Sequence, residues 1–333
     1  MNDLYTKATS YAALYAAYQR AAKNRGKNLA RIAFARHLEE NLITLRDELA
    51  AGTYRPGKYT RMTVYEPKKR IIEALPFRDR VVQQALFAVL LPLFERSMIY
   101  DSYACRKGKG TIRGAKRAQK FLRAAGASAW VLKGDIYHFF ASMEREKILL
   151  RIARKVHDAR MLASISLFLP QERGVPIGNL MSQLFANVLL DAFDHYMMDA
   201  RGNGRYVRYM DDFILVLPSK ARAKRELAAA RAFLLSLGLT LNGKTQIFPA
   251  RQGINFLGFY ITRQRMRLRR ETVRRVKWRV RRFRKLRARH LAHVMDCRPW
   301  LSSYLGFAKH GDCAALTRSV LRLLNGGVLI EEF

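Results

Sequence analysis

The segment from Tyr206 to Leu217, YVRYMDDFILVL, constrains this chain more than any other. It places two adjacent carboxylates, Asp211 and Asp212, between two short runs of β-branched and aromatic residues, which are typical of strands. Because two neighbouring charges cost too much to bury inside a strand, the pattern predicts a hairpin with the aspartates at a tight tip. Such a tip presents carboxylate oxygens to hard divalent cations. An isolated acidic pair is more often a solvated turn, so the rest of the sequence decides between these interpretations.

The charge of the chain indicates a polyanionic partner. Among 333 residues, 62 are Lys or Arg and 26 are Asp or Glu, which gives a formal net charge of +36. Half of the residues are hydrophobic, so we expect a folded protein with a sizeable core. A membrane surface is the alternative partner, but the basic residues are spread along the chain and flank no apolar anchor. The most apolar run, Val81 to Phe94, contains two Gln and Pro92, and the amino terminus lacks a signal pattern. We therefore expect a cytoplasmic protein without membrane contact.

The cysteines predict no disulfide framework. There are three of them, an odd number that suits a reducing compartment. Two of them belong to a group near the carboxyl terminus that could be considered for zinc: His290, His293, Cys297, His310 and Cys313. The spacings match no common zinc finger or ribbon, so ordinary helix and loop positions are the favoured interpretation.

The order of the expected elements favours an α+β fold. Apolar residues at helical spacing occupy residues 4 to 50, and helices are also expected over 77–94, 144–169, 180–198 and 220–237. Strands are expected at Tyr59–Tyr65, Arg70–Leu75, Ala129–Ile136, both sides of the aspartate pair, Thr240–Ile247 and Ile254–Ile261. Strands mixed with helices, without regular alternation, predict an antiparallel sheet with helices on one face and the other face open to a ligand.

Asp135 gives the aspartate hairpin a possible partner. It lies at the end of an apolar strand, VLKGDI, shortly before the aromatic pair Phe139 and Phe140. Alone it would be a strand-end capping residue, but together with Asp211 it meets the minimum for a two-metal site. In such sites, carboxylates bridge two Mg²⁺ ions about 3.5–4 Å apart. Mg²⁺ fills its other positions with water and phosphate oxygens, so two or three carboxylates suffice.

Taken in order, the blocks of this chain resemble those of reverse transcriptases. Arg70 in YEPKKRII resembles the fingers block of that family, and DIYHFF resembles the block that carries its first palm aspartate. GVPIGNLMSQLFANVLLDAFD resembles the next block, YMDD the signature hairpin, and LGLTLNGKTQI and INFLGFYI the two blocks that follow. The resemblance covers residues 55 to 262. It implies a right-hand polymerase with fingers, palm and thumb, and an RNA-directed DNA polymerase activity.

The resemblance also implies roles for individual residues. Asp135 and Asp211 would be ligands of two Mg²⁺ ions, with Asp212 a supporting carboxylate and the Ile136 carbonyl a further contact. Arg70 would hold the incoming triphosphate, because a guanidinium contacts phosphate oxygens in a bidentate way. The implied nucleotide-binding set is Lys68, Lys69, Arg70, Phe140, Ile177, Gln183 and Lys244.

Two members of that set have a specific implied role. Phe140, five residues after Asp135, matches the bulky residue that blocks a ribose 2′-hydroxyl, so deoxynucleotides would be selected by exclusion. Lys244 matches the lysine that the family keeps near the primer end or the triphosphate. Taken singly, each of these positions is more often a surface charge or a core aromatic.

One departure from the common pattern indicates a subtype. Group II intron and retroviral enzymes usually carry Pro-Gln-Gly before this helix and Ser-Pro a few residues further on, whereas this chain has Pro176-Ile177-Gly178 and then Ser182-Gln183. The form IGNxxSQLFAN resembles the reverse transcriptases of diversity-generating retroelements. Those enzymes copy a template-repeat RNA with errors opposite adenines, and they work with a small, basic, oligomeric accessory variability determinant protein. The resemblance would also imply that the protein is encoded by a bacterium or a phage.

A physical argument accompanies this resemblance. A glutamine at position 177 could hydrogen-bond near the nascent base pair, and Ile177 cannot. Loss of a polar contact worth about 1–3 kcal/mol weakens discrimination by roughly ten- to hundredfold. The hypothesis is that Ile177 lowers fidelity; the alternative is that it only packs under its loop.

The segment after the last block is strongly basic. From Arg263 to Arg289, fifteen of 27 residues are Arg or Lys, and apolar residues recur at helical spacing from Val273 to Leu286. We expect this stripe to pack on the palm. The basic face would lie along a nucleic-acid backbone and contact its phosphates independently of the base sequence. The predicted contacts are Arg274, Arg275, Lys277, Arg279, Arg281, Arg282, Arg284 and Lys285.

The expected division of the chain is a helical extension (1–54), fingers (55–128), palm (129–262, with a helical 144–170 insertion) and a helical thumb (263–333). Its expected partners are template RNA, a cDNA or primer strand, deoxynucleotides and the accessory protein. Two alternatives stay open. One is a group II intron or retron relative, although the former normally has a longer maturase region and the latter usually has Ala where Met210 stands. The other is a catalytically inactive nucleic-acid-binding scaffold.

Overall fold

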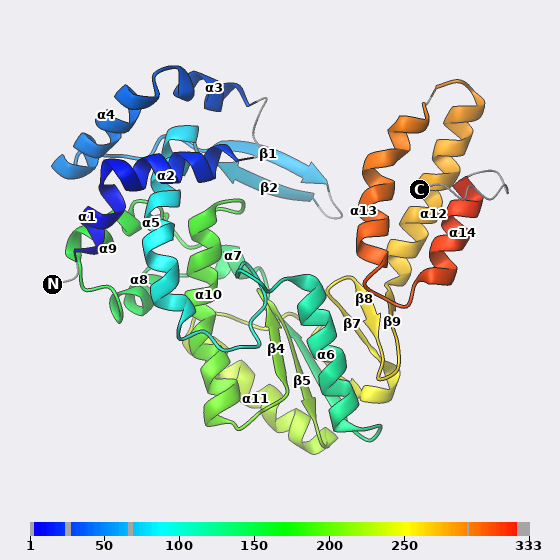
Figure 1. The fold of residues 1–333 in the computed structure, drawn as a ribbon. Helices are drawn as coiled ribbons and strands as arrows, with labels where there is room; N and C mark the ends of the chain where they lie inside the picture. The colour runs from blue at the N-terminus through cyan, green and yellow to red at the C-terminus, as the bar shows by residue number, and fades with distance from the viewer. Residues whose placement is uncertain (1–2, 24–27, 66–68, 292, 325–333) are drawn as a thin grey trace. The chain divides into compact units, whose positions relative to one another are not determined.

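The computed structural model describes residues 3–23, 28–65, 69–291 and 293–324 (Figure 1). The chain divides into two compact units. The first unit comprises Met1–Tyr100, Asp135–Gly202 and Ala228–Lys244. The second comprises Asp101–Gly134, Asn203–Leu227 and Thr245–Phe333. Each unit is therefore built from segments that are far apart in the sequence.

The first unit is mainly helical. Its helices are α1 (Leu4–Thr9), α2 (Tyr11–Ala22), α3 (Leu29–Arg36), α4 (Leu38–Ala51), α5 (Phe77–Glu95), α7 (Phe139–Ser142), α8 (Arg145–Ala153), α9 (Ala159–Ser166) and α10 (Leu180–His195), continued by a π-helical turn, Tyr196–Ala200. Helix α11 (Lys220–Ser236) belongs to it from Ala228 onward. The helical expectation for residues 4–50 is confirmed over α1 to α4, with breaks at Ser10 and His37; residues 24–27 of the expected stretch lie outside the described residues. The Ser10 side chain accepts a hydrogen bond from the Ala13 amide and so begins α2.

A two-stranded hairpin completes the first unit. Strands β1 (Thr60–Tyr65) and β2 (Lys69–Ala74) pair antiparallel, with Val64 opposite Arg70. Both were expected from the sequence. Lys68 lies outside the described residues, so its expected role is not placed by the structure.

The second unit contains two antiparallel sheets. The larger has the strand order β4-β5-β3-β6, with β3 (Trp130–Asp135), β4 (Tyr206–Tyr209), β5 (Asp212–Leu217) and β6 (Gln246–Pro249). The smaller joins β7 (Ile254–Phe256), β8 (Phe259–Ile261) and β9 (Met266–Leu268). Its helices are α6 (Thr111–Ala125), α12 (Arg270–Ala288), α13 (Arg298–Ala308) and α14 (Ala314–Leu324), with short 3-10 turns at Ala250–Gln252 and Val294–Cys297.

Two strand predictions were wrong in their extent. The single strand expected over Ile254–Ile261 is a hairpin, because Leu257 and Gly258 adopt positive φ angles of 49° and 89° and reverse the chain. A side chain on Gly258 would also meet the Phe307 ring at 2.8 Å. The strand expected over Thr240–Ile247 is reduced to β6 and an isolated bridge between Leu241 and Ile136.

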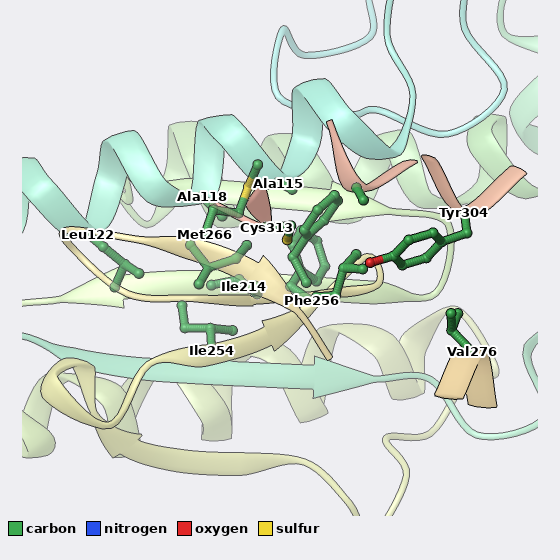
Figure 2. Close-up of a cluster of buried hydrophobic side chains, with 14 of the residues drawn as sticks. Ala115, Ala118, Leu122, Ile214, Ile254, Phe256, Met266, Val276, Tyr304 and Cys313 are labelled. Atoms are coloured by element: carbon green, nitrogen blue, oxygen red, sulfur yellow. The ribbon is translucent and has the colours of Figure 1, made fainter. Parts of the chain in front are cut away.

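A hydrophobic cluster joins the helices and sheets of the second unit. It joins Ala115, Ala118 and Leu122 of α6 with Ile214 of β5 and residues of the smaller sheet (Figure 2). The apolar stripe of α12 enters the same cluster through Val276, Val280 and Phe283, as the helical spacing predicts. The basic face of that helix consequently stays exposed to solvent.

These elements confirm the expected fold class: mixed α and β structure with an antiparallel sheet on which a helix packs. The division into fingers, palm and thumb at the stated boundaries stays a prediction.

Candidate active site

The hairpin predicted around the aspartate pair is formed by β4 and β5, but only Asp211 of the pair lies at its tip. Tyr209 is paired with Asp212, so Met210 and Asp211 form the tip and Asp212 is already the first residue of β5. Met210 has a left-handed backbone with φ of 56°, a conformation that costs a non-glycine residue roughly 1–2 kcal/mol. Both carboxylates are half-buried. The turn is therefore strained at the residue directly before Asp211.

A fully buried arginine contacts this turn. Arg208 donates from Nη1 to the Met210 carbonyl (3.1 Å) and from Nη2 to Ser102 Oγ (3.2 Å). Its own amide donates to the Asp101 carbonyl at 3.0 Å, and its carbonyl accepts from the Tyr103 amide at 2.9 Å. Arg208 thus connects the aspartate turn with the loop that begins at Asp101. Arg208 stands directly before the YMDD signature, but nothing in the local sequence pattern indicates this role.

Asp135 is the last residue of β3, the direct sheet neighbour of β5. The preceding residue, Gly134, packs on the ring of Phe213, the residue that follows Asp212. A Cβ on Gly134 would lie 2.1 Å from the Phe213 Cζ, so only glycine fits. This contact sets how closely the end of β3 approaches the start of β5.

Asn242 orients the Asp135 carboxylate. Its Nδ2 donates to Asp135 Oδ2 at 3.0 Å, and its amide donates to the Asp135 carbonyl at 2.7 Å. The same side chain accepts from the Lys244 amide at 3.1 Å, and Lys244 itself is exposed. The buried Ile136 forms its bridge with Leu241 in the same region. Asn242 is a further residue that sequence reasoning missed, although the block LNGK contains it.

The loop before α10 is tied to two other segments of the first unit. The Glu73 amide of β2 donates to the Ile177 carbonyl at 2.9 Å, and a Cβ on Gly178 (φ 106°) would lie 2.7 Å from Cγ2 of Ile72. The Val175 amide donates to the Phe140 carbonyl at 2.8 Å. The structure therefore brings together β2, the segment that follows Asp135 and the loop that carries Ile177.

The remaining members of the expected nucleotide-binding set occupy accessible positions. Lys69 and Arg70 are exposed on β2, while Phe140, Ile177 and Gln183 are half-buried. The Phe140 ring lies 5.5 Å from the Phe139 ring, centroid to centroid. These positions leave the side chains of β2 open to a charged ligand.

The basic positions of α12 are exposed or half-buried, as expected for the helix face opposite its apolar stripe. Trp278 lies among them with 55% of its surface exposed, and the Arg282 guanidinium is 5.4 Å from its ring centroid. An exposed indole beside arginines offers both a stacking surface and positive charge.

The donor chemistry of the three acids suits a hard divalent cation. Asp135, Asp211 and Asp212 offer hard carboxylate oxygens in half-buried positions. In the described part of the chain, no group of three or more His, Cys, Asp or Glu side chains is arranged to hold a metal by itself. Such a site would depend on substrate phosphates and water for its other ligands.

Near the carboxyl terminus, Cys297 and Cys313 are buried in the hydrophobic cluster, and burial raises the pKa of both thiols.

Comparisons with known proteins agree with the resemblance found in the sequence. A family model described as reverse transcriptase (RNA-dependent DNA polymerase) matches residues 61–261. The chain is 28% identical over 281 residues to protein YkfC of Escherichia coli (strain K12), covering 69% of this chain and 73% of that protein. It is 24% identical over 204 residues to the group II intron-encoded protein LtrA of Lactococcus lactis subsp. cremoris, covering 56% of this chain and 34% of LtrA.

A solved structure shares the fold. Apo telomerase from Candida Tropicalis aligns with a TM-score of 0.50 at 11% identity, covering 64% of this chain and 49% of the telomerase chain. The chain thus spans about a third of LtrA and half of that telomerase chain. No helix within the described ranges has the length and apolar character needed to cross a bilayer.

Proposed function

The chain belongs to the reverse transcriptase family, and on that premise we propose that it is an RNA-templated DNA polymerase acting by two-metal nucleotidyl transfer. The observation that carries the proposal is the position of the acids in the sheet. Asp135 ends β3, and the neighbouring strand β5 begins at Asp212, directly after Asp211. Carboxylates at the ends of adjacent strands suit a shared cation site.

In this proposal Asp135, Asp211 and Asp212 hold two Mg²⁺ ions, with the Ile136 carbonyl as a further contact. When bound, the ions would lower the pKa of the primer 3′-hydroxyl and neutralise charge on the phosphates. Arg208 keeps the strained turn in place, and Asn242 holds one oxygen of Asp135 in a fixed direction. The chain's own contribution is therefore to position the acids before substrate arrives.

The nucleotide would be held between β2 and the loop before α10. Lys68, Lys69 and Arg70 would contact the triphosphate, with Lys244 near the primer end and Gln183 beside the nascent pair. Phe140 would occupy the space that a ribose 2′-hydroxyl needs. The Glu73–Ile177 hydrogen bond supports this arrangement, because it ties the loop to the strand that carries Arg70.

The finer assignment is a reverse transcriptase of a diversity-generating retroelement. It would copy a template-repeat RNA, make errors opposite adenines and work with a small helical accessory protein, in the cytoplasm of a bacterium or a phage-infected cell. The sequence Ile177-Gly178-Asn179 and the pair Ser182-Gln183 support it. Within the chain, residues 55–128 would form the fingers, 129–262 the palm and 263–333 the thumb, with the basic face of α12 along the nucleic acid.

A second candidate is a reverse transcriptase of the group II intron type. The similarity to LtrA, a group II intron-encoded protein, favours it. The two candidates differ in their expected products, because only the first predicts errors concentrated at template adenines.

Primer extension tests the general proposal. The full chain, an RNA template, an annealed primer, deoxynucleotides and Mg²⁺ should yield cDNA. Asp135→Asn and Asp211→Asn should each reduce the rate by more than about 100-fold, since metal-bound carboxylates contribute several kcal/mol to the transition state. The matched control is Asp47→Asn, an exposed acid on α4. Undiminished extension by Asp211→Asn would refute the proposal. Sequencing the cDNA then separates the two candidates by the location of the errors.

A further inference from the structure

A basic pocket outside the proposed catalytic set lies within the second unit. Its volume is about 530 Å³, a size typical of ligand sites. It is lined by Lys116, Lys120 and Arg123 of α6 and by Lys309 and His310, which follow α13. Because positions 116, 120 and 123 recur every three or four residues, they share one face of α6. Cations from two distant segments therefore surround one hollow.

The walls of the pocket are fixed by hydrogen bonds. From α6, Gln119 Nε2 donates to the Thr262 carbonyl at 3.2 Å and Arg123 Nε donates to the Arg263 carbonyl at 2.8 Å. On the other side, Asp312 Oδ2 accepts from the Met266 amide at 2.7 Å, and the Asp312 amide donates to the Met266 carbonyl at 2.6 Å. The pocket is thus formed before any ligand binds.

The wall formed by residues 309–312 can lie close to Met266 only because residue 311 is a glycine. A Cβ at this position would lie 2.7 Å from the Met266 carbonyl oxygen, a backbone atom that cannot move aside. Met266 itself is buried in the hydrophobic cluster beside Ala118 and Leu122 (Figure 2). The base of the pocket is therefore part of the core of the unit.

The lining of the pocket carries more positive than negative charge. Within the described ranges, Lys116, Lys120 and Lys309 form no ion pair. The single acid of the lining, Asp312, directs an oxygen to the Met266 amide. Like charges around one hollow repel each other, and an anion in the hollow removes that repulsion.

We propose that this pocket binds backbone phosphates of an RNA strand at a place separate from the polymerase site. Lysines act as point charges that suit phosphate groups. The choice of RNA rests on the proposed function, which brings a long RNA to a chain with a net charge of +36. Phosphate contacts hold a strand in position without reading its sequence. The pocket would keep hold of the RNA while the polymerase site moves along it.

Salt-dependent RNA binding tests the proposal. The full-length protein is titrated into 5′-labelled single-stranded RNA, without Mg²⁺ or deoxynucleotides, and anisotropy is followed over a series of salt concentrations. The pocket variant combines Lys116→Gln, Lys120→Gln and Lys309→Gln. The log–log salt slope should become shallower by about 2, because each lost phosphate contact on a single strand removes about 0.7.

The matched control removes the same charge elsewhere. Lys224→Gln, Arg225→Gln and Arg231→Gln change three exposed cations of α11 and should leave the slope close to that of the unchanged protein. Equal losses in both triple variants would overturn the proposal, because the effect would then reflect net charge alone. An unchanged affinity in the pocket variant would also overturn it and would favour an acidic protein segment as the occupant.

Two further measurements keep the test independent of folding and of polymerase activity. Thermal melting of both triple variants shows whether they fold. RNA carrying 4-thiouridine should crosslink to peptides from α6 or from residues 309–312 in the unchanged protein, and crosslinks confined to other peptides would contradict the proposal. The rate at which the pocket variant extends a short RNA–DNA hybrid should stay within about twofold of the rate of the unchanged protein. If the unchanged protein extends no primer, the proposed function fails, but the RNA-binding result still decides whether the pocket binds RNA.

Discussion

The guanidinium of Arg208 donates a hydrogen bond to the carbonyl oxygen of Met210 at 3.1 Å. Met210 carries the left-handed backbone of the turn and precedes Asp211, so a buried side chain two residues away holds the strained residue. The other terminal nitrogen of the same guanidinium, Nη2, donates to the hydroxyl of Ser102, which belongs to another segment of the same unit. The position of the turn consequently depends on a contact between segments about a hundred residues apart.

Arg208→Met should destabilise the protein and slow extension. The change leaves the Met210 carbonyl and the Ser102 hydroxyl without this donor, at a cost of about 1–3 kcal/mol for a buried group. Arg208→Lys should restore only part of the loss, because an ammonium cannot reproduce the planar fork. Urea denaturation and primer extension measure the two effects. Arg225→Met, at an exposed position, is the control, and equal behaviour of the two Met variants would contradict the assignment.

Gly134→Ala should lower the free energy of unfolding by about 1–3 kcal/mol, because its Cβ would overlap the Phe213 ring. Phe213→Leu in the same chain should recover part of this loss by making room. The control is Gly306→Ala on α13, where nothing lies within 4 Å and alanine favours the helix. A Gly134→Ala variant as stable as Gly306→Ala would show that the strands separate easily.

Asn242→Ala should raise the Mg²⁺ concentration needed for half-maximal extension by about tenfold, the usual effect of removing a residue that orients a metal ligand. A titration of extension rate against Mg²⁺ measures it. Asn41→Ala removes a half-buried amide of α4 that donates to the Phe34 carbonyl of α3, and it should change stability without moving the Mg²⁺ requirement. Identical Mg²⁺ curves for the two variants would exclude the positioning role.

Phe140→Ala should allow ribonucleotides to be incorporated. If the ring blocks the 2′-hydroxyl, the ratio of kcat/KM for deoxynucleotides over ribonucleotides should fall by about tenfold or more. Single-nucleotide extension with each substrate measures the ratio. Tyr137→Ala changes an exposed aromatic of the same segment and should leave the ratio unaltered. A constant ratio in Phe140→Ala would assign the selection to another residue.

Ile177→Gln should reduce errors opposite template adenines by about tenfold, because a glutamine can restore a polar contact to the nascent pair. Deep sequencing of cDNA from one template gives the error spectrum. Ile177→Val keeps the apolar character and should leave the spectrum unchanged. If the Gln variant makes as many adenine errors as the unchanged chain, Ile177 only packs beneath its loop.

Local patterns in the sequence were sufficient to predict most of the helices and strands. The runs of β-branched and aromatic residues on both sides of Asp211 and Asp212 predicted the β4–β5 hairpin, and the apolar spacing from Val273 to Leu286 predicted the buried stripe of α12. Such patterns work because side chains of one strand or helix face depend on residues only a few positions apart. The same reasoning failed for Ile254–Ile261, where two successive positive φ angles turn an alternating run into a hairpin.

The amino-acid order by itself determined which residues are acidic, basic or apolar, and therefore the family and the kinds of chemistry open to the chain. Only the tertiary structure decided which residues position the groups that carry this chemistry. Arg208, Asn242 and Gly134 act through contacts with Ser102, Asp135 and Phe213, and the basic pocket joins α6 to residues after α13. The physical reason is that these partners are separated by about 80 to 200 residues, so no local periodicity records their contact, and packing alone brings them together.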